Sequence, residues 1–295
     1  MKHAYLIMAH TDAPLLGILL SMLDDERNDI FLHIDKKAKN LNPRVFSTSR
    51  AQLFIIEERI PVYWGHSSQV DLEMLLFRTA TKKGTYAYYH LLSGTDLPIK
   101  TQDHIHTFFS QHQGKEFVTC WTDGSKTFTH NRMAKYHLFM EWEQRQKSFC
   151  GRAFAKLRTL LTHLLGEKNI TYPLMTGPNW VSITHDFVSY LLKKEKEIKR
   201  LCRYTRNADE IFLQTILWDS PFKANLYKAE EDRPLSKGCL REIFWKEHQN
   251  SPELITRAYW EEIKNSECLF ARKFSTAADA EIIQRIKETY GYVHQ

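Results

Sequence analysis

The stretch Tyr86–Lys100, which reads YAYYHLLSGTDLPIK, decides the fold. It opens with a short apolar and aromatic run, Tyr86–Leu92, whose length and composition favour a buried strand over a helix. The chain then breaks into the turn Ser93–Asp96, and Pro98 prevents a helix from starting directly afterwards. Such a turn places the carboxylate of Asp96 at the carboxyl edge of a sheet, where open α/β folds bind ligands. The alternative role for Asp96 is to cap its own turn.

Short strands and helices alternate on both sides of this stretch. The predicted strands are His3–Ala9, Asp29–Asp35, Gln52–Ile56 and Trp180–Ile183, and the predicted helices are Leu15–Leu23, Ser67–Thr81, His185–Leu192 and Ala208–Leu217. This alternation in short steps predicts an α/β fold with a mostly parallel central sheet flanked by helices.

The middle and the end of the chain are less regular. We expect strands at Lys115–Cys120 and Arg241–Trp245, a helix or loop at Arg132–Trp142, a basic amphipathic helix at Arg152–Leu165, and helices at Thr256–Lys264 and Ala278–Tyr290. No linker-like composition separates these parts, so residues 1–295 are expected to form a single domain with a C-terminal extension.

The composition excludes several classes of protein. The 295 residues are 43% hydrophobic, which is enough for a sizeable core, and no run of about 20 apolar residues predicts a membrane span. The formal charge is +6, and the Lys clusters are mixed with Glu, which argues against nucleic-acid binding. Five cysteines without a CxxC pair indicate reduced thiols in a cytosolic protein.

The motifs of common enzyme classes are also absent. The sequence has no GxGxxG, GxxxxGK[ST], GxSxG or HExxH pattern, so dinucleotide, P-loop, α/β-hydrolase and zinc-protease sites are unsupported. Polar residues do follow or precede the predicted strands, namely His10, Asp12, Asp35, Asp96 and Asn179. Parallel strands end at one edge of a sheet, so we expect these side chains to line one cleft.

Seven fragments in a fixed order resemble a known family. They are AYLIMAH, FLHIDKKA, VYWGHSSQVDLE, HLLSGTDLPIK, TGPNWVSITHDFVSYLL, NADEIFLQTIL and LFARKF, from about residue 4 to about residue 275. Together they resemble the core-2/I-branching β-1,6-N-acetylglucosaminyltransferases and the related protein O-xylosyltransferases. The resemblance implies a GT-A type nucleotide-sugar fold. It makes residues 1–120 the nucleotide-binding half, 121–235 the acceptor and catalytic half, and 236–295 a segment that contributes diphosphate-binding residues.

The resemblance also implies an activity. It is inverting, metal-independent transfer of a sugar, GlcNAc being favoured, from a UDP-sugar to a glycan hydroxyl with formation of a β-linkage. No Asp-x-Asp motif closes a strand, in keeping with a site that needs no metal and no cofactor. The alternatives are a UDP-xylose-dependent β-xylosyltransferase and a catalytically silent sugar-nucleotide or glycan binder of the same fold.

The expected setting is a bacterial, cytoplasmic enzyme of polysaccharide biosynthesis, because the chain lacks the anchor, stem and paired cysteines of the animal enzymes. Its acceptor would be a glycan or a lipid-linked glycan. The basic helix Arg152–Leu165 leaves open a peripheral contact with the inner membrane, with ordinary packing as the alternative.

The resemblance assigns the donor site to Met8, Asp35, Tyr63, Asp96, Arg241, Arg272 and Lys273. Met8 would face the uracil, Asp35 the uridine, and Tyr63 would stack as an aromatic, with a core position as its alternative. The charge of a departing diphosphate must be stabilised, and without a metal ion Lys or Arg must do so. Lys273 matches the family's diphosphate-binding lysine, with Arg241 or Arg272 as the second cation. The alternative for Arg272 and Lys273 is a solvated basic pair.

The same resemblance makes Glu210 the general base, which would deprotonate the acceptor hydroxyl. Its neighbour Asp209 would then be a helix cap, and capping is also the alternative role for Glu210. The acceptor side is matched more loosely, by Arg132, Lys135, Tyr136 and the aromatic platform Trp245.

Overall fold

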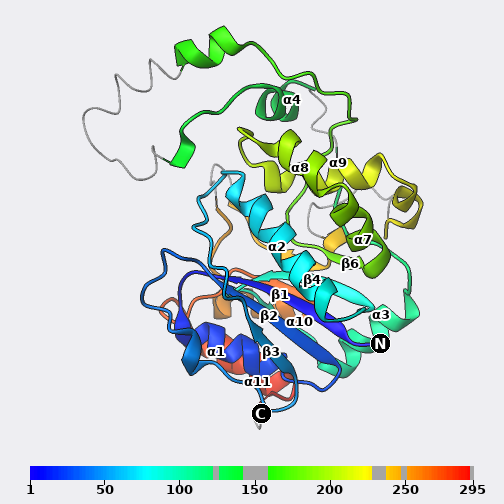
Figure 1. Ribbon diagram of the computed structural model, residues 1–295. Coiled ribbons are helices and arrows are strands. Elements are labelled where there is room, and N and C mark those ends of the chain that lie inside the picture. The colour runs from blue at the N-terminus through cyan, green and yellow to red at the C-terminus, as the bar shows by residue number, and fades with distance from the viewer. Residues whose placement is uncertain (122–125, 142–158, 228–236, 247–250, 293–295) are drawn as a thin grey trace.

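A computed structural model describes residues 1–121, 126–141, 159–227, 237–246 and 251–292. Its centre is a five-stranded sheet, which Figure 1 shows as the body of the molecule with a smaller helical part above it. The strands, in their order across the sheet, are β3 (Gln52–Ile55), β2 (Asn28–Ile34), β1 (His3–Ala9), β4 (Tyr88–Ser93) and β6 (Ser182–Thr184).

The first four strands of this sheet run parallel, and β6 runs antiparallel to β4. In the register of the central strands, Ile7 lies between Leu32 and Leu92. A parallel strand is covered on both faces, which explains why the sequences of β1, β2 and β4 are nearly continuous apolar runs. The mostly parallel sheet predicted from the alternation of elements is confirmed.

Helices cover both faces of the sheet (Figure 1). One hydrophobic cluster packs α1 (Ala13–Met22), α3 (Gln102–Gln111), α10 (Trp260–Asn265) and α11 (Ala280–Thr289) against one face. A second cluster packs α2 (Ser68–Lys83), α7 (His185–Lys193), α8 (Glu195–Cys202) and α9 (Phe212–Trp218) against the other. Four of these helices begin at side-chain caps, with Asp12 before α1, Thr101 before α3, Thr184 before α7 and Asp279 before α11.

A second sheet joins the C-terminal segment to the turn after β4. Its order is β5 (Leu97–Pro98), β8 (Phe270–Arg272) and β7 (Arg241–Ile243), with β8 antiparallel to β5 and parallel to β7. Pro98 is tolerated because β5 is an edge strand. This sheet carries the basic residues of LFARKF back to the Ser-Gly-Thr-Asp turn.

Several elements differ from the prediction. The predicted strand Lys115–Cys120 is wrong as a regular strand, because it forms only the isolated bridges Glu116–Leu226 and Phe117–Ser182. The predicted helix Ala208–Leu217 is two elements, the 3-10 turn η2 (Ala208–Glu210) and α9, separated by Ile211 with a non-helical φ of −127°. The other 3-10 turns are η1 (Pro43–Val45), η3 (Pro221–Asn225), η4 (Lys237–Cys239) and η5 (Arg257–Tyr259).

Near Arg132–Trp142, the helix α4 (Lys126–Ala134) begins earlier than predicted. Residues 159–165 of the predicted basic helix are helical, and residues 152–158 lie outside the described residues. Within the described residues, no helix is both long and apolar enough to cross a membrane. The single domain over 1–295, with its three parts, stays a prediction.

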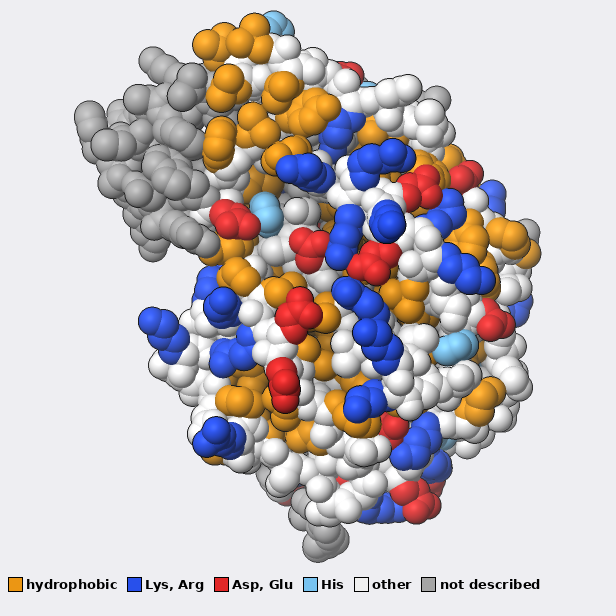
Figure 2. Space-filling view, viewed as in Figure 1, with side chains coloured by type: hydrophobic (Ala, Val, Ile, Leu, Met, Phe, Trp, Pro, Cys, Tyr) orange, Lys and Arg blue, Asp and Glu red, His pale blue; other side chains and the backbone are white. Residues whose placement is uncertain are grey.

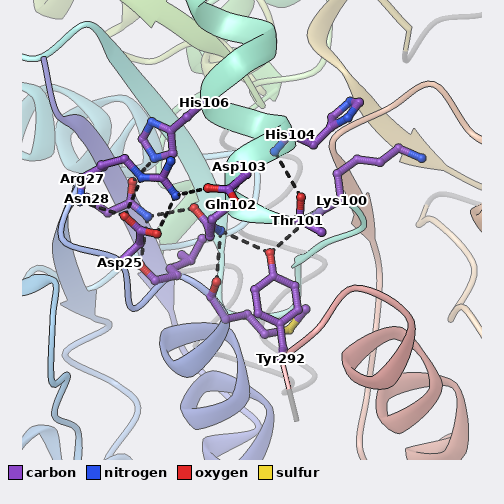
Figure 3. Close-up of polar contacts among 12 residues, drawn as sticks. Asp25, Arg27, Asn28, Lys100, Thr101, Gln102, Asp103, His104, His106 and Tyr292 are labelled. Atoms are coloured by element: carbon purple, nitrogen blue, oxygen red, sulfur yellow. Dashed lines mark hydrogen bonds and ion pairs between the residues drawn. The ribbon is translucent and has the colours of Figure 1, made fainter. Parts of the chain in front are cut away.

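A buried polar network occupies the amino edge of the central sheet (Figure 3). Asn28 donates to the Gln102 side-chain carbonyl at 2.9 Å, and its own carbonyl oxygen lies 2.9 Å from Nε2 of His106. Arg27 pairs with Asp25 at 2.7 Å and with Asp103 at 2.8 Å. These contacts fasten α3 to the start of β2.

Candidate active site

Charged side chains meet at the carboxyl edge of the sheet, on the left in Figure 1, where β1 ends and α1 begins. His10 follows β1, Asp35 follows β2, and Lys273 follows β8. Partial burial lowers the pKa of His10; the charge of Lys273 and, to a smaller extent, that of Lys37 lower it further, whereas Asp35 raises it. These shifts indicate that the three charged groups lie near one imidazole, and the two lysines make this edge suited to an anionic ligand.

Asp35 is held in place by its own turn. Its carboxylate accepts a hydrogen bond from the backbone N–H of Lys37 at 2.7 Å, and the Lys37 ammonium lies 3.7 Å from the other oxygen. The same ammonium lies 4.2 Å from the centre of the Tyr63 ring and donates to the Val62 carbonyl. Tyr63 is buried, so a base could stack on its face only after Lys37 moved. Met8 is partly buried on β1, opposite Ser93 of β4.

Asp96 faces inward. Its carboxylate accepts hydrogen bonds from the Ser93 backbone N–H at 2.9 Å and from the Ser93 hydroxyl at 2.7 Å, which is the turn-capping role. Nε of Arg272 lies 3.4 Å from Asp96, and its guanidinium lies 3.8 Å from the Trp180 ring. Asp96 therefore holds Arg272 in a largely buried position. Lys273 is partly exposed and forms no ion pair with a described residue.

Arg241 is placed still deeper. The residue is completely buried, and its guanidinium donates to the Ser182 hydroxyl at 2.8 Å, the Val181 carbonyl at 2.8 Å, the Leu91 carbonyl at 3.3 Å and the Cys239 carbonyl. These hydrogen bonds thus hold the guanidinium in the interior between β4 and β6. The structure does not bring Arg241 to the surface on which Lys273 lies.

Glu210 lies on η2, in the other half of the fold. Its carboxylate is 38% exposed and lies 2.9 Å from the Arg132 guanidinium of α4. The Glu210 carbonyl accepts a hydrogen bond from the Gly177 backbone N–H at 2.9 Å. A Cβ at Gly177 would lie 2.0 Å from the Thr119 carbonyl oxygen, so only glycine fits. The turn that contains Gly177 therefore positions the backbone of Glu210.

Two buried acids lie beneath Glu210. Asp209 accepts a hydrogen bond from Gln69 at 2.9 Å, and Asn179 lies 3.4 Å from Glu73. Burial and the neighbouring charge of Glu210 raise the pKa of Asp209 to about 7. Burial and the charge of Asp209 raise the pKa of Glu73 well above its ordinary value. Because two buried carboxylates this close disfavour double ionisation, Glu73 is the one we expect to stay protonated.

The sequence predicted only part of this arrangement. Arg132, expected to bind the acceptor, contacts the carboxylate of Glu210 instead. Asn179 contacts Glu73, and Asp12 accepts hydrogen bonds from Thr276, so neither of these two side chains is directed to a ligand. Glu73 was missed, although an acid within the apolar stripe of α2 was a signal.

Two other predicted acceptor residues, Lys135 and Tyr136, line a cavity of about 710 Å³. Trp64, His137, Met140, Thr159, Thr162, His163, Gly166, Glu167 and Arg206 also line it. Trp245 is exposed beyond β7 and does not line this cavity. Within the part of the chain that the structure describes, no three His, Cys, Asp or Glu side chains gather as metal ligands.

The family model for the Core-2/I-Branching enzyme matches residues 3–268, which is most of the chain. The chain belongs to the Core-2/I-branching enzyme family. The predicted α/β fold, with a mostly parallel central sheet flanked by helices, is confirmed. The match includes Glu210 and Arg132 of this Core-2/I-branching chain and ends just before β8.

The curated relatives of this family member are xylosyltransferases at low identity. Xylosyltransferase 2 of Rattus norvegicus is 22% identical over 304 residues, covering 95% of this chain and 33% of the relative. Xylosyltransferase 2 of Homo sapiens is 22% identical over 230 residues, covering 74% of this chain and 24% of the relative. Xylosyltransferase oxt of Drosophila pseudoobscura pseudoobscura is 22% identical over 210 residues, covering 68% of this chain and 22% of the relative. The chain thus spans about a third or less of the length of these relatives.

Among solved structures, mouse xyloside xylosyltransferase 1 in its apo form is similar with a TM-score of 0.37 and 9% identity. The similarity covers 91% of this chain and 97% of the mouse chain.

Proposed function

We propose that this Core-2/I-branching chain is an inverting, metal-independent glycosyltransferase that moves GlcNAc from a UDP-sugar to a glycan hydroxyl. The observation that carries the proposal is the placement of Glu210. Its carboxylate is partly exposed, is oriented by Arg132, and stands on a turn whose backbone is held by Gly177. A general base needs this combination of access and fixed position.

In the proposed reaction, an acceptor hydroxyl oxygen forms a bond to the anomeric carbon of the donor sugar. The bond from that carbon to the diphosphate breaks, and its electron pair leaves with UDP. The proton of the hydroxyl passes to the Glu210 carboxylate. Attack opposite the leaving group inverts the anomeric centre and forms the β-linkage.

The leaving diphosphate would be stabilised by Lys273, which is partly exposed beside His10 and Lys37. Figure 2 shows Lys and Arg side chains at the same left-hand edge of the body and down the middle of the viewed face. A lysine ammonium can stabilise the charge that develops on a phosphoryl oxygen without a metal ion. We therefore propose transfer without a divalent cation or any other cofactor.

UDP-xylose is the second candidate donor. The curated relatives named above are xylosyltransferases, which favours xylose, whereas the family resemblance favoured GlcNAc. We propose a glycan or lipid-linked glycan as acceptor, and a bacterial, cytoplasmic enzyme of polysaccharide biosynthesis with a peripheral contact at the inner membrane. A catalytically silent binder of the same fold would bind these ligands without transfer.

Glu210→Gln tests the base directly. The substitution keeps the size of the side chain and an oxygen for Arg132, but the amide cannot take the proton of the acceptor. We expect transfer from UDP-GlcNAc or UDP-xylose, measured in EDTA, to fall about 10²–10⁴-fold. UDP affinity and melting temperature should stay nearly unchanged.

The matched control for this test is Glu261→Gln, on the exposed side of α10. A normal rate with a lowered melting temperature in Glu210→Gln would make Glu210 a structural cap. Activity that disappears in EDTA and returns with a divalent cation would contradict the metal-independent reaction.

A further inference from the structure

The cavity lined by Lys135 and Arg206 has the size of a ligand site. Its volume of about 710 Å³ lies within the range of roughly 300–1,000 Å³ that is usual for small-molecule pockets. Glu210 is not among the described lining residues, but the segments that carry Glu210 and its partner Arg132 both contribute to the lining. Arg206 lies four residues before Glu210, and Lys135 lies three residues after Arg132, the ion-pair partner of Glu210.

The walls of the cavity are tied together by hydrogen bonds. The Thr162 hydroxyl donates to the Tyr136 carbonyl at 2.9 Å. The Lys168 backbone N–H donates to the Ala134 carbonyl at 2.8 Å, and its ammonium donates to the Thr205 hydroxyl at 2.7 Å. The 159–168 segment, the end of α4 and the approach to η2 are therefore connected, so the cavity is built by described residues on all of these sides.

The lining of the cavity is electropositive. Lys135 and Arg206 are exposed, and neither forms an ion pair with a described residue. His137 and His163 add two further nitrogen-bearing rings, and among the described lining residues Glu167 is the one carboxylate. Two unneutralised cations in a hollow attract an anionic ligand more strongly than the same charges on a flat surface.

An exposed indole stands beside one of these cations. Trp64 is 59% exposed, and the Arg206 guanidinium lies 5.8 Å from the centre of its ring. An indole offers a broad apolar face to the C–H side of a sugar ring, and its N–H can still reach a polar partner. A guanidinium next to that face can bind a carboxylate or phosphate through paired N–H groups. Together they fit a sugar that carries an anionic substituent.

We propose that this cavity is the acceptor site, and that its acceptor is a saccharide with an anionic group, either a carboxylate or a phosphate, which contacts Arg206 while the ring stacks on Trp64. The role as an acceptor rests on the proposed transferase function. The binding preference does not, because it can be measured without a donor.

The test is calorimetric binding of three disaccharides that share one skeleton, namely cellobiose, cellobiouronic acid and 6-phosphocellobiose. We expect at least one of the two anionic disaccharides to bind about tenfold or more tightly than cellobiose, as for a charge-assisted hydrogen bond. The carboxylate and the phosphate ligands, compared with each other, decide which anionic group the site prefers. Arg206→Gln should remove most of that preference, and Trp64→Ala should weaken all three ligands.

Arg203→Gln is the matched control, since Arg203 is exposed three residues away and does not line the cavity. We expect it to keep the full preference. Equal binding of the three disaccharides, or an equal loss of preference in Arg203→Gln and Arg206→Gln, would overturn the proposal. Melting temperatures of the variants identify any that fail to fold, and Arg206→Lys then provides a second variant that keeps the charge and should retain part of the preference.

Transfer assays separate this proposal from the transferase function. Selective binding of an anionic disaccharide without sugar transfer would contradict the proposed reaction but support the proposed binding site. Transfer to cellobiose with no preference for the charged disaccharides would support the reaction and overturn the anionic acceptor.

Discussion

Lys273 and Arg272 are neighbours in sequence, and the structure gives them different roles. Arg272 is held by Asp96 and Trp180, whereas Lys273 is partly exposed and free of ion pairs among the described residues. The resemblance identified both as candidates for the diphosphate. Their partners separate them, because Arg272 ends β8 against Asp96 and Lys273 follows the strand without such a partner among the described residues.

Lys273→Ala should therefore weaken UDP more than uridine. A charge-assisted contact contributes about 1.5–3 kcal/mol, so we expect UDP affinity to fall about 10–150-fold and uridine affinity to change little. Calorimetry with both ligands measures the difference, and Lys264→Ala on the exposed side of α10 is the matched control. Equal losses for UDP and uridine would show that Lys273 acts through folding.

At the residue level, the sequence could predict the place of a site residue only where the turn that carries the residue also holds its side chain. Asp35 follows this rule, since the turn after the strand positions it locally. Glu210 does not, because Gly177 and Arg132 hold it from distant segments. Arg241 does not, because a charged residue in a strand gives no local sign that it will be buried against carbonyls of Val181 and Leu91. Glu73 likewise has its partner on a distant segment.

At the scale of elements, the pairing of the small β5-β8-β7 sheet could not be predicted, although a strand was expected at Arg241–Trp245. Its strands are two or three residues long, too short for a periodic pattern, and β5 pairs with β8 at residues that are more than 170 positions apart. The central strands were predictable because fully buried parallel strands have continuous apolar sequences. The helix α3 was missed because its sequence is mostly polar.

Arg241→Met tests the role of this sheet's buried guanidinium. The substitution removes the guanidinium hydrogen bonds to the Val181, Leu91 and Cys239 carbonyls and to the Ser182 hydroxyl, although Val181 still accepts from the Leu91 N–H and the Ser182 hydroxyl still contacts His90. Each hydrogen bond to a charged group contributes about 1.5–3 kcal/mol. We expect the free energy of unfolding to fall by at least about 3 kcal/mol in denaturant titration. Arg44→Met, on an exposed turn, should have almost no effect. An Arg241→Met protein that stays stable but binds UDP more weakly would show that Arg241 belongs to the donor site.

At the scale of the whole molecule, buried histidines make stability depend on pH. The side chains of His3 and His90 lie 3.0 Å apart, and the His3 and His106 rings are 4.1 Å apart. Burial, followed by neighbouring positive charge, lowers the pKa of His106 to about 4, and burial lowers the pKa values of His3 and His90 well below the ordinary value. The folded state therefore binds fewer protons than the unfolded state below about pH 6.5.

We expect these histidines to destabilise the fold as the pH falls from about 6.5 to about 4. His106→Asn keeps an amide near Asn28 and removes one titrating ring, so the slope of unfolding free energy against pH should decrease by about one proton in this window. Denaturant titration at several pH values measures the slope, with the exposed His130→Asn as control. An unchanged slope in His106→Asn would contradict the assignment.

Buried acids change the stability in the opposite direction over nearly the same pH range. The pKa of Asp209 is raised to about 7, mainly by burial, and burial also raises the pKa of Glu116 to about 7. Their contribution to the free energy of unfolding is complete below about pH 4 and is lost as the pH rises toward 7. The measured curve of the whole protein is the sum of both trends, which is why the comparison with His106→Asn is needed.

The pairing of β5 with β8 means that the end of the family match is not the end of the folding unit. A protein shortened to residues 1–268, where the family match ends, would retain Glu210 and Arg132. It would lose β8, so β7 would have an open edge, Asp96 would be buried without Arg272, and Asp12 would lose its contacts with Thr276. Exposed strand edges promote aggregation. We therefore expect the shortened protein to precipitate although every residue of the matched region is present.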